Sequence, residues 1–206
     1  VLGTSAGMAE FLENDNVLVD PDLLVSHGTG SNLQSATGVV SPFIDGIDQL
    51  SFTPVGGITG SLLDGGGALS LTGNASAADY QAALRSIVYE SDNDDPPASV
   101  NVEFRVHDGS HFSEPVSRTV NITPQNDRPV VTVNNALLNF NEGDVLSVDN
   151  QLTLADPDHT SIQTATISIT TGFQISEDIL QFANAGGISG VYSAGTMTLT
   201  GPATLD

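Results

Sequence analysis

The chain has 206 residues, with 25 acidic residues against four basic ones and no cysteine, and its formal net charge at pH 7 is −21. This charge excludes sequence-independent binding to nucleic acid, which requires a basic surface, and it argues against attachment to anionic membranes. The absence of cysteine excludes disulfides and thiol chemistry, so an exported domain built from this sequence would need another stabiliser, such as bound metal ions.

No apolar run is long enough to cross a membrane, and no signal peptide is visible. The chain begins at Val1 rather than at a methionine, so we expect a processed chain or a fragment, with any export signal outside it.

Short apolar segments separated by turn residues run through the first part of the chain, up to Ala75. We expect strands at residues 17–25, 36–40, 49–52, 58–62 and 68–72, with a turn at residues 28–31. Pro21 inside the first of these segments is typical of an edge or bulged strand. Asp64-Gly65-Gly66-Gly67 predicts a hairpin between the last two. This spacing favours an antiparallel β-sandwich.

One helix is expected in this part of the chain. Ser76-Ala77-Ala78-Asp79 resembles a capping box with Asp in place of Glu or Gln, and good helix formers continue to Arg85. Tyr80, Leu84 and Ile87 recur at helical spacing and predict a stripe that contacts the core. Further strands are expected at residues 87–89, 100–106 and 115–122, with an Asp108-Gly109 turn. The acidic segment at 91–97 favours a solvated loop, and metal binding by Asp92, Asp94 and Asp95 is the less favoured alternative.

The remainder of the chain repeats this sequence pattern with a nearly constant shift in residue number, so that Phe140 is the counterpart of Phe11. Residues 11–15 (FLEND) match residues 140–144 (FNEGD), and residues 56–60 (GGITG) match residues 186–190 (GGISG). A unit of this length has the size of a domain rather than of a solenoid repeat. The second repeat is expected to run through the same strands, but the sequence contains no second copy of residues 80–122.

The repeat gives a domain organisation. We expect an all-β chain of tandem antiparallel β-sandwiches with a cadherin- or immunoglobulin-like architecture and one short helix in the first repeat. The first repeat covers residues 1–123 and a linker covers 124–129. The second repeat, residues 130–206, is expected to be incomplete and to leave strands without partners. The prolines at both ends of the linker favour an extended connector.

Three segments resemble the cadherin-like tandem repeats of large bacterial surface proteins and adhesins. The most specific is residues 78–89 (ADYQAALRSIVY). Val106-His107-Asp108-Gly109 resembles a turn of those repeats, and Asn126-Asp127-Arg128-Pro129 resembles their junction. The resemblance covers essentially the whole chain, and it implies an extracellular rod of β-sandwiches with calcium between consecutive repeats.

By analogy with cadherins, the resemblance implies a calcium site built from an early glutamate, the linker and an Asp-x-Asp motif. The corresponding residues are Glu13, Asn126, Asp127, Asp156 and Asp158. Calcium takes six to eight oxygen ligands from carboxylates, amides and carbonyls, so these side chains are chemically suitable. A solvated turn at Asp156-Pro157-Asp158 is the alternative, because Asp and Pro favour turns.

The first repeat has His27-Gly28-Thr29 where the second has Asp156-Pro157-Asp158. Because this tripeptide supplies no carboxylate, we predict no calcium site of the junction type at that end of the first repeat.

No enzyme is expected. The sequence has no Gly-x-Ser-x-Gly nucleophile elbow, and its glycine-rich stretches lack the lysine of a phosphate-binding loop. His107 and His111 flank a glycine turn and do not form a helical zinc pair.

We therefore expect a non-catalytic structural or adhesive repeat at the cell surface, stiffened by calcium at the junction between repeats. Its expected partners are neighbouring repeats, copies of itself, or a surface glycan or protein. One alternative is a subunit of an extracellular filament whose open repeat is filled by a neighbour's strand. A carbohydrate-binding module is a second alternative, against which stand the absence of tryptophan and the presence of only three tyrosines.

Overall fold

The computed structural model describes residues 1–28, 30 and 32–205 of the chain. It divides into two compact units, Val1–Gln125 (unit 1) and Asn126–Asp206 (unit 2). Two residues of the turn expected at 28–31, Thr29 and Ser31, lie outside the described residues. No helix among the described residues is long and apolar enough to cross a membrane.

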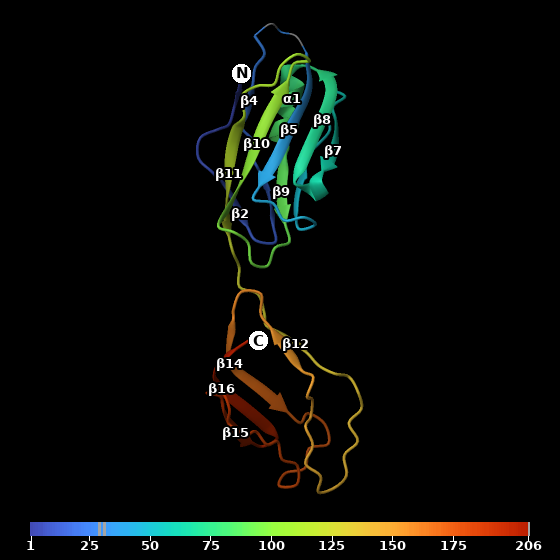
Figure 1. The fold of residues 1–206 in the computed structure, drawn as a ribbon, viewed down its shortest axis with the longest axis vertical. Helices are drawn as coiled ribbons and strands as arrows, with labels where there is room; N and C mark the ends of the chain where they lie inside the picture. Colours follow the sequence, from blue (N-terminus) through green and yellow to red (C-terminus); the bar gives the residue numbers. More distant parts are fainter. Residues whose placement is uncertain (29, 31, 206) are drawn as a thin grey trace. The chain divides into compact units, whose positions relative to one another are not determined.

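Unit 1 is a β-sandwich, as the sequence predicts. One layer is a six-stranded sheet with the order β2-β11-β10-β5-β8-β7 (Figure 1). Its strands are β2 (Ala9–Leu12), β5 (Leu33–Ser41), β7 (Thr59–Leu63), β8 (Ala68–Ala75), β10 (Ser99–His107) and β11 (Val116–Thr123). All neighbouring strands are antiparallel except β2, which pairs with β11 in parallel.

The second layer of unit 1 is smaller. It is a three-stranded sheet of β3 (Asn16–Leu18), β9 (Val88–Ser91) and β6 (Asp48–Ser51) in the order β3-β9-β6. A short pair of strands, β1 (Leu2–Gly3) and β4 (Leu24–Val25), forms a separate two-stranded sheet.

Alternating side chains explain why the two layers pack together. Along β10, Val102 and Phe104 are buried whereas the intervening Glu103 is not, because successive side chains of a strand point to opposite faces. The buried side chains of both layers form one core. Within it the rings of Phe11 (β2) and Tyr89 (β9) meet edge to face, with 5.2 Å between ring centroids.

The helix α1 (Ala77–Arg85) confirms the predicted capping box. The Asp79 amide donates to Ser76 Oγ at 3.1 Å, and the Ser76 amide donates to Asp79 Oδ2 at 3.2 Å. The predicted stripe of Tyr80, Leu84 and Ile87 is fully buried in the core. The predicted hairpin between β7 and β8 is also present, with a short 3-10 turn η1 (Asp64–Gly66) at its tip.

The expectation of one strand over residues 17–25 is wrong. The chain forms β3, turns at residues 20–22 and then forms β4. The buried Asp20 carboxylate fixes this turn by accepting the amides of Ser5 (2.9 Å) and Asp22 (3.3 Å). Pro21 has no amide to donate to a strand ladder, so a turn at this position removes no hydrogen bond.

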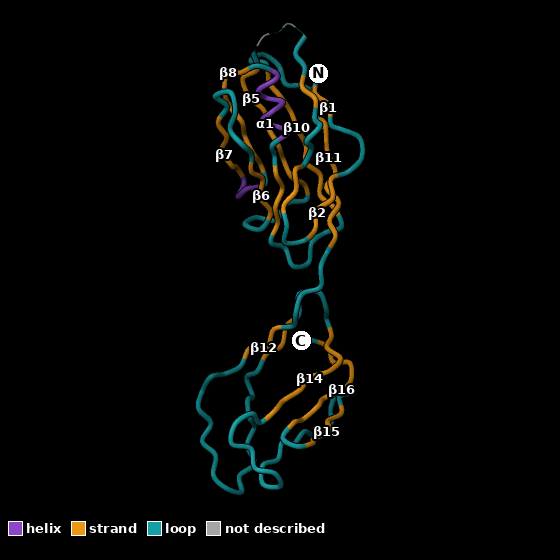
Figure 2. The backbone as a smooth tube through the Cα atoms, turned by 180° about the vertical axis from the view of Figure 1, so that it is seen from behind, coloured by secondary structure: helices purple, strands orange, loops and turns teal. Residues whose placement is uncertain are grey.

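Unit 2 contains five strands among its described residues. They form a pair, β12-β13, and a three-stranded sheet in the order β14-β16-β15. The strands are β12 (Val130–Thr132), β13 (Thr153–Ala155), β14 (Ser161–Ser168), β15 (Ser189–Ser193) and β16 (Thr196–Thr204). Figure 2 shows that much of the remaining chain of unit 2 is loop.

The internal repeat is visible in strand pairing and in hydrogen bonds. Strands β14, β16 and β15 repeat the order of β5, β8 and β7. The pair of Val131 and Leu154 in unit 2 is the counterpart of the pair of Leu2 and Val25 in unit 1. The amide of Ile44 donates to Asp48 Oδ2 at 2.8 Å, and its counterpart in unit 2, the amide of Gln174, donates to Asp178 Oδ2 at 2.7 Å.

The expectation that the second repeat runs through the same strands is wrong for the segments equivalent to β3 and β6, which are irregular in unit 2. The segment equivalent to β2, a strand that the sequence did not predict, is irregular as well. In unit 1, β2 pairs with β11, whereas β3 and β6 both pair with β9. The described residues of unit 2 contain no counterpart of β9 or β11, so these three segments lack the strands that would hold them extended.

Candidate metal centres

Glu13 of unit 1 is a buried carboxylate that is only partly satisfied. It follows β2, and its side chain is 1% exposed. The Gln125 amide donates to Glu13 Oε2 at 2.6 Å, while the Gln125 side chain donates to the Glu13 carbonyl at 2.8 Å. The other carboxylate oxygen, Oε1, is buried and has no hydrogen-bond partner among the described residues.

A second carboxylate lies close to Glu13. Asp94, in the loop that follows β9, places a carboxylate oxygen within 4.8 Å of one from Glu13. Two carboxylates at ~4 Å repel by ~1–4 kcal/mol, depending on the local dielectric. An unsatisfied buried polar atom costs a further ~1–3 kcal/mol. A bound cation would remove both costs, so these residues fit a metal ion.

Unit 2 brings together a second set of acidic side chains. Asp156 Oδ1 accepts the amides of Asp158 (3.1 Å) and His159 (2.9 Å) and lies 3.2 Å from His159 Nδ1. The amide of Asp127 donates to Asp158 Oδ2. Possible ligand atoms of Asp156, Asp158 and His159 all lie within 4.8 Å of one another. The β12-β13 pairing positions these residues, because it aligns Val130 with Ala155.

The five residues predicted from the sequence are therefore divided between the units. Glu13 lies in unit 1, whereas Asn126, Asp127, Asp156 and Asp158 lie in unit 2. Within unit 2, Asp127 and Asp158 are in hydrogen-bond contact, and Asp156 lies beside Asp158. Asn126 is exposed and its side-chain amide donates to the Asp127 carbonyl at 2.6 Å.

Two candidate ligands are not among the predicted site residues. Asp94 belongs to the segment expected to be a solvated acidic loop, and the sequence predicts no role for His159. The acidic loop itself is a signal, but its position depends on β9 pairing with β3, which starts shortly after Glu13. His159 directly follows Asp156-Pro157-Asp158, so its proximity could have been inferred from the sequence.

The position equivalent to Asp156-Pro157-Asp158 in unit 1 is only partly described, since Thr29 lies outside the described residues. His27 Nε2 lies 3.5 Å from Asp108 Oδ2. The amides of His111 and Ser110, each at 2.8 Å from Asp108 Oδ1, hold the pKa of Asp108 at about 2. The absence of a calcium site here stays a prediction.

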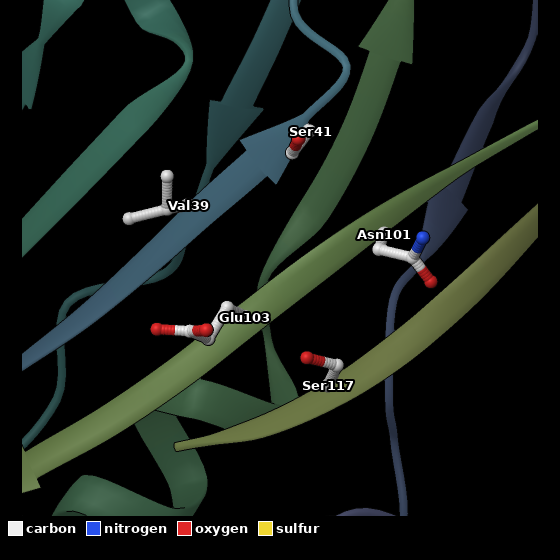
Figure 3. A pocket seen from close by; sticks show the side chains of 5 residues that line it. All are labelled: Val39, Ser41, Asn101, Glu103 and Ser117. Carbon is white, nitrogen blue, oxygen red and sulfur yellow. The ribbon is translucent and has the colours of Figure 1, made fainter.

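The outer face of the six-stranded sheet has a shallow depression of about 290 Å³. Figure 3 shows its five lining side chains, Val39 and Ser41 on β5, Asn101 and Glu103 on β10, and Ser117 on β11. None of these five residues is aromatic. The depression therefore has no ring on which a sugar could stack.

No protein-family model matches the chain, and no curated protein matches its sequence. Among solved structures it is similar to extracellular cadherin domains 3–6 of protocadherin gamma B2, at 15% identity and a TM-score of 0.26. The match covers 97% of this chain and 39% of that structure. This likeness is too distant to assign a function.

Proposed function

We propose that this chain is a non-catalytic structural or adhesive repeat of the cell surface, stiffened by calcium where its two units join. The observation that carries the proposal is the buried Oε1 atom of Glu13, which has no partner among the described residues and lies on a carboxylate close to that of Asp94. Buried polar atoms are almost always paired, and a cation at this position would supply the partner of Oε1 and offset the repulsion between the two carboxylates.

The chemistry of the donors favours calcium. Glu13 and Asp94 offer only oxygen ligands, and the chain has no cysteine that would favour zinc. Asp94 lies in an irregular loop, and calcium accepts irregular geometry more readily than magnesium does.

The sequence of the linker is one reason to propose a single site whose ligands come from both units. Glu13 binds the backbone of Gln125, and only Asn126 separates Gln125 from Asp127. Because each residue spans at most ~3.3–3.6 Å, covalent connectivity keeps Asp127 within reach of a cation bound by Glu13. The amide of Asp127 donates a hydrogen bond to the Asp158 carboxylate, and the amide of Asp158 donates to Asp156 Oδ1. We infer that Asn126, Asp127, Asp156 and Asp158 supply the remaining ligands.

We propose an extracellular location because calcium there is concentrated enough to fill a site of this kind. Extracellular calcium modules have dissociation constants of ~10⁻⁴–10⁻³ M, which millimolar calcium outside cells can fill. The net charge of −21 increases the local concentration of cations. The partners we propose are neighbouring repeats, further copies of the chain, or a surface protein or glycan. The depression in Figure 3 supports a carbohydrate-binding module least, since its lining has no aromatic ring.

The decisive experiment compares Glu13→Gln with the wild-type chain, with and without calcium. In chelator, the variant should be as stable as the wild type or more stable, because a neutral amide replaces a buried carboxylate near Asp94. In calcium, the wild type should gain ~1.4 kcal/mol per site at about ten times the dissociation constant, and the variant should not. Glu10→Gln, at an exposed position of β2, is the matched control.

Isothermal calorimetry and urea unfolding measure these effects. A variant destabilised equally with and without calcium would show that Glu13 is only structural, and the proposal would fail. Small-angle scattering tests the stiffening separately. Chelation, or Asp127→Ala in the presence of calcium, should broaden the distribution of distances between the units, whereas Asp64→Ala should leave it unchanged.

A further inference from the structure

Unit 2 exposes apolar side chains whose counterparts in unit 1 form the core. Phe11 is 2% exposed, whereas Phe140, its counterpart in the second repeat, is 62% exposed. Val19 is fully buried whereas Val148 is 66% exposed. Three further residues of unit 1, Leu2, Ala9 and Leu23, are buried. Their respective counterparts in unit 2, Val131, Leu138 and Leu152, are exposed. These five exposed apolar positions of unit 2, each equivalent to a buried position of unit 1, mark a surface suited to contact with another polypeptide segment.

Unit 1 shows what the covering element is. It is the segment that contains α1, β9, β10 and β11. Strand β10 pairs with β5 from Asn101 opposite Ser41 to His107 opposite Ser35. Strand β9 pairs with β3 and β6, and its Tyr89 packs on Phe11. Strand β11 pairs with β2.

Strand β14 presents the edge that this segment would occupy. It is the counterpart of β5, and it pairs with β16 on one side. On its other side no strand is present among the described residues. The unpaired amides and carbonyls of such an edge are a template for another strand.

We propose that unit 2 is an acceptor for a polypeptide segment built like residues 77–123, with one helix followed by three strands. Its middle strand adds antiparallel to β14, and its helix and remaining strands cover Phe140, Val148 and Leu152. A second copy of unit 2 is a poorer occupant, because its described residues offer no counterpart of the helix or of Tyr89. The inference does not depend on calcium.

One position makes the acceptor selective. A Cβ added at Gly38 of β5 would lie 3.5 Å from Ile87 Cδ1 and 3.6 Å from Phe104 Cε1. Unit 2 has Ile167 at this position, since Ile167 is opposite Met197 just as Gly38 is opposite Leu69. Three further carbons beyond that Cβ would overlap an isoleucine or phenylalanine at the positions of Ile87 and Phe104. The accepted segment therefore carries a smaller side chain there, and unit 2 discriminates against the segment of unit 1.

The test adds synthetic peptides of residues 76–123 to the full chain and follows hydrogen exchange of the β14 amides. The peptide with Phe104→Ala should protect β14 and the region of Phe140, at a concentration at least roughly tenfold lower than the wild-type peptide requires. Ile167→Gly in the chain should restore binding of the wild-type peptide. Thr166→Gly, at an outward-facing position of the same strand by analogy with Thr37, is the control.

Exchange of the unit 1 amides reports that each variant remains folded. The absence of β14 protection with both peptides, in the wild type and in Ile167→Gly, would overturn the proposal. So would β14 protection without any peptide together with a dimer in analytical ultracentrifugation, because a second copy would then be the occupant. Equal binding of the two peptides to all variants would overturn the selectivity.

Discussion

Asp48 and Glu13 are both buried carboxylates of unit 1, but they differ in their hydrogen bonds. Asp48 Oδ2 accepts the Ile44 amide at 2.8 Å, and Asp48 Oδ1 accepts the Tyr89 hydroxyl at 2.8 Å. Both of its oxygens are therefore satisfied by the protein. Glu13 has one oxygen without a partner among the described residues. This difference is why we place the proposed cation site at Glu13 and not at Asp48.

The Asp48 and Tyr89 pair gives a prediction about alkaline pH. Burial raises the pKa of Tyr89 above its ordinary value of 10.0, and the hydrogen bond to Asp48 raises it further. The resulting stabilisation is present below pH 10 and is lost as pH rises beyond it, because the unfolded chain releases the proton first. Tyr89→Phe should lower stability at neutral pH by ~1–3 kcal/mol, because Asp48 loses a donor.

Urea unfolding from about pH 8 to about pH 11 would measure both effects. The variant should lose less stability than the wild type over this range. Tyr80, whose pKa burial also raises, should retain part of the slope. An identical slope in both proteins would contradict the assignment.

Asp108 gives the corresponding prediction at acid pH. The amides of His111 and Ser110 lower its pKa to about 2, from an ordinary value of 3.8. A lowered pKa stabilises the fold above the ordinary value, and this contribution is lost as pH falls from about 4 to about 2. Asp108→Asn should reduce the dependence of the urea midpoint on pH in that window. Asp64→Asn, in the β7–β8 hairpin, should not.

At the scale of elements, the features with local signals were predictable from the sequence. The capping box predicted the start of α1, and the strands expected on either side of the Asp108-Gly109 turn correspond to β10 and β11. Strand β2 was not predicted, because its four residues are held by parallel pairing with β11, a strand near the opposite end of unit 1 in the sequence. The same reason explains Asp94, whose proximity to Glu13 depends on strand pairing rather than on spacing.

The cap of α1 is the element whose stability is most directly testable. Ser76→Ala removes the acceptor for the Asp79 amide and should lower the free energy of unfolding by ~1 kcal/mol. Ser76→Asp should retain most of the stability, since an aspartate can also cap. Chemical denaturation measures both, with Ser110→Ala at an exposed turn as the control. No loss in Ser76→Ala would mean that packing of Tyr80 and Leu84 alone determines where the helix begins.

At the scale of the whole molecule, the two units differ in how much apolar surface they bury. Among the described residues, all the buried apolar side chains except Met197 belong to unit 1. The sequence repeat predicted equivalent strands, and the structure retains those whose partners are also repeated. The sequence repeat could not predict the exposure of Phe140 or Val148. That exposure depends on whether a segment like the one containing α1, β9, β10 and β11 covers these residues, and not on the residues themselves.

This difference predicts that the two units unfold separately. Burial of apolar surface is the main stabilising contribution to folding, so unit 2 should open at a lower denaturant concentration than unit 1. Hydrogen exchange of the full chain should show slow exchange in β5 and β10 and faster exchange in β14 and β16. Val102→Ala should lower the free energy of unfolding of unit 1 by ~1–3 kcal/mol and leave the transition of unit 2 unchanged. Leu199→Ala, in β16, should affect only the transition of unit 2. A single cooperative transition shifted by both substitutions would show that the units stabilise each other, and that the exposed side chains of unit 2 are covered within the chain itself.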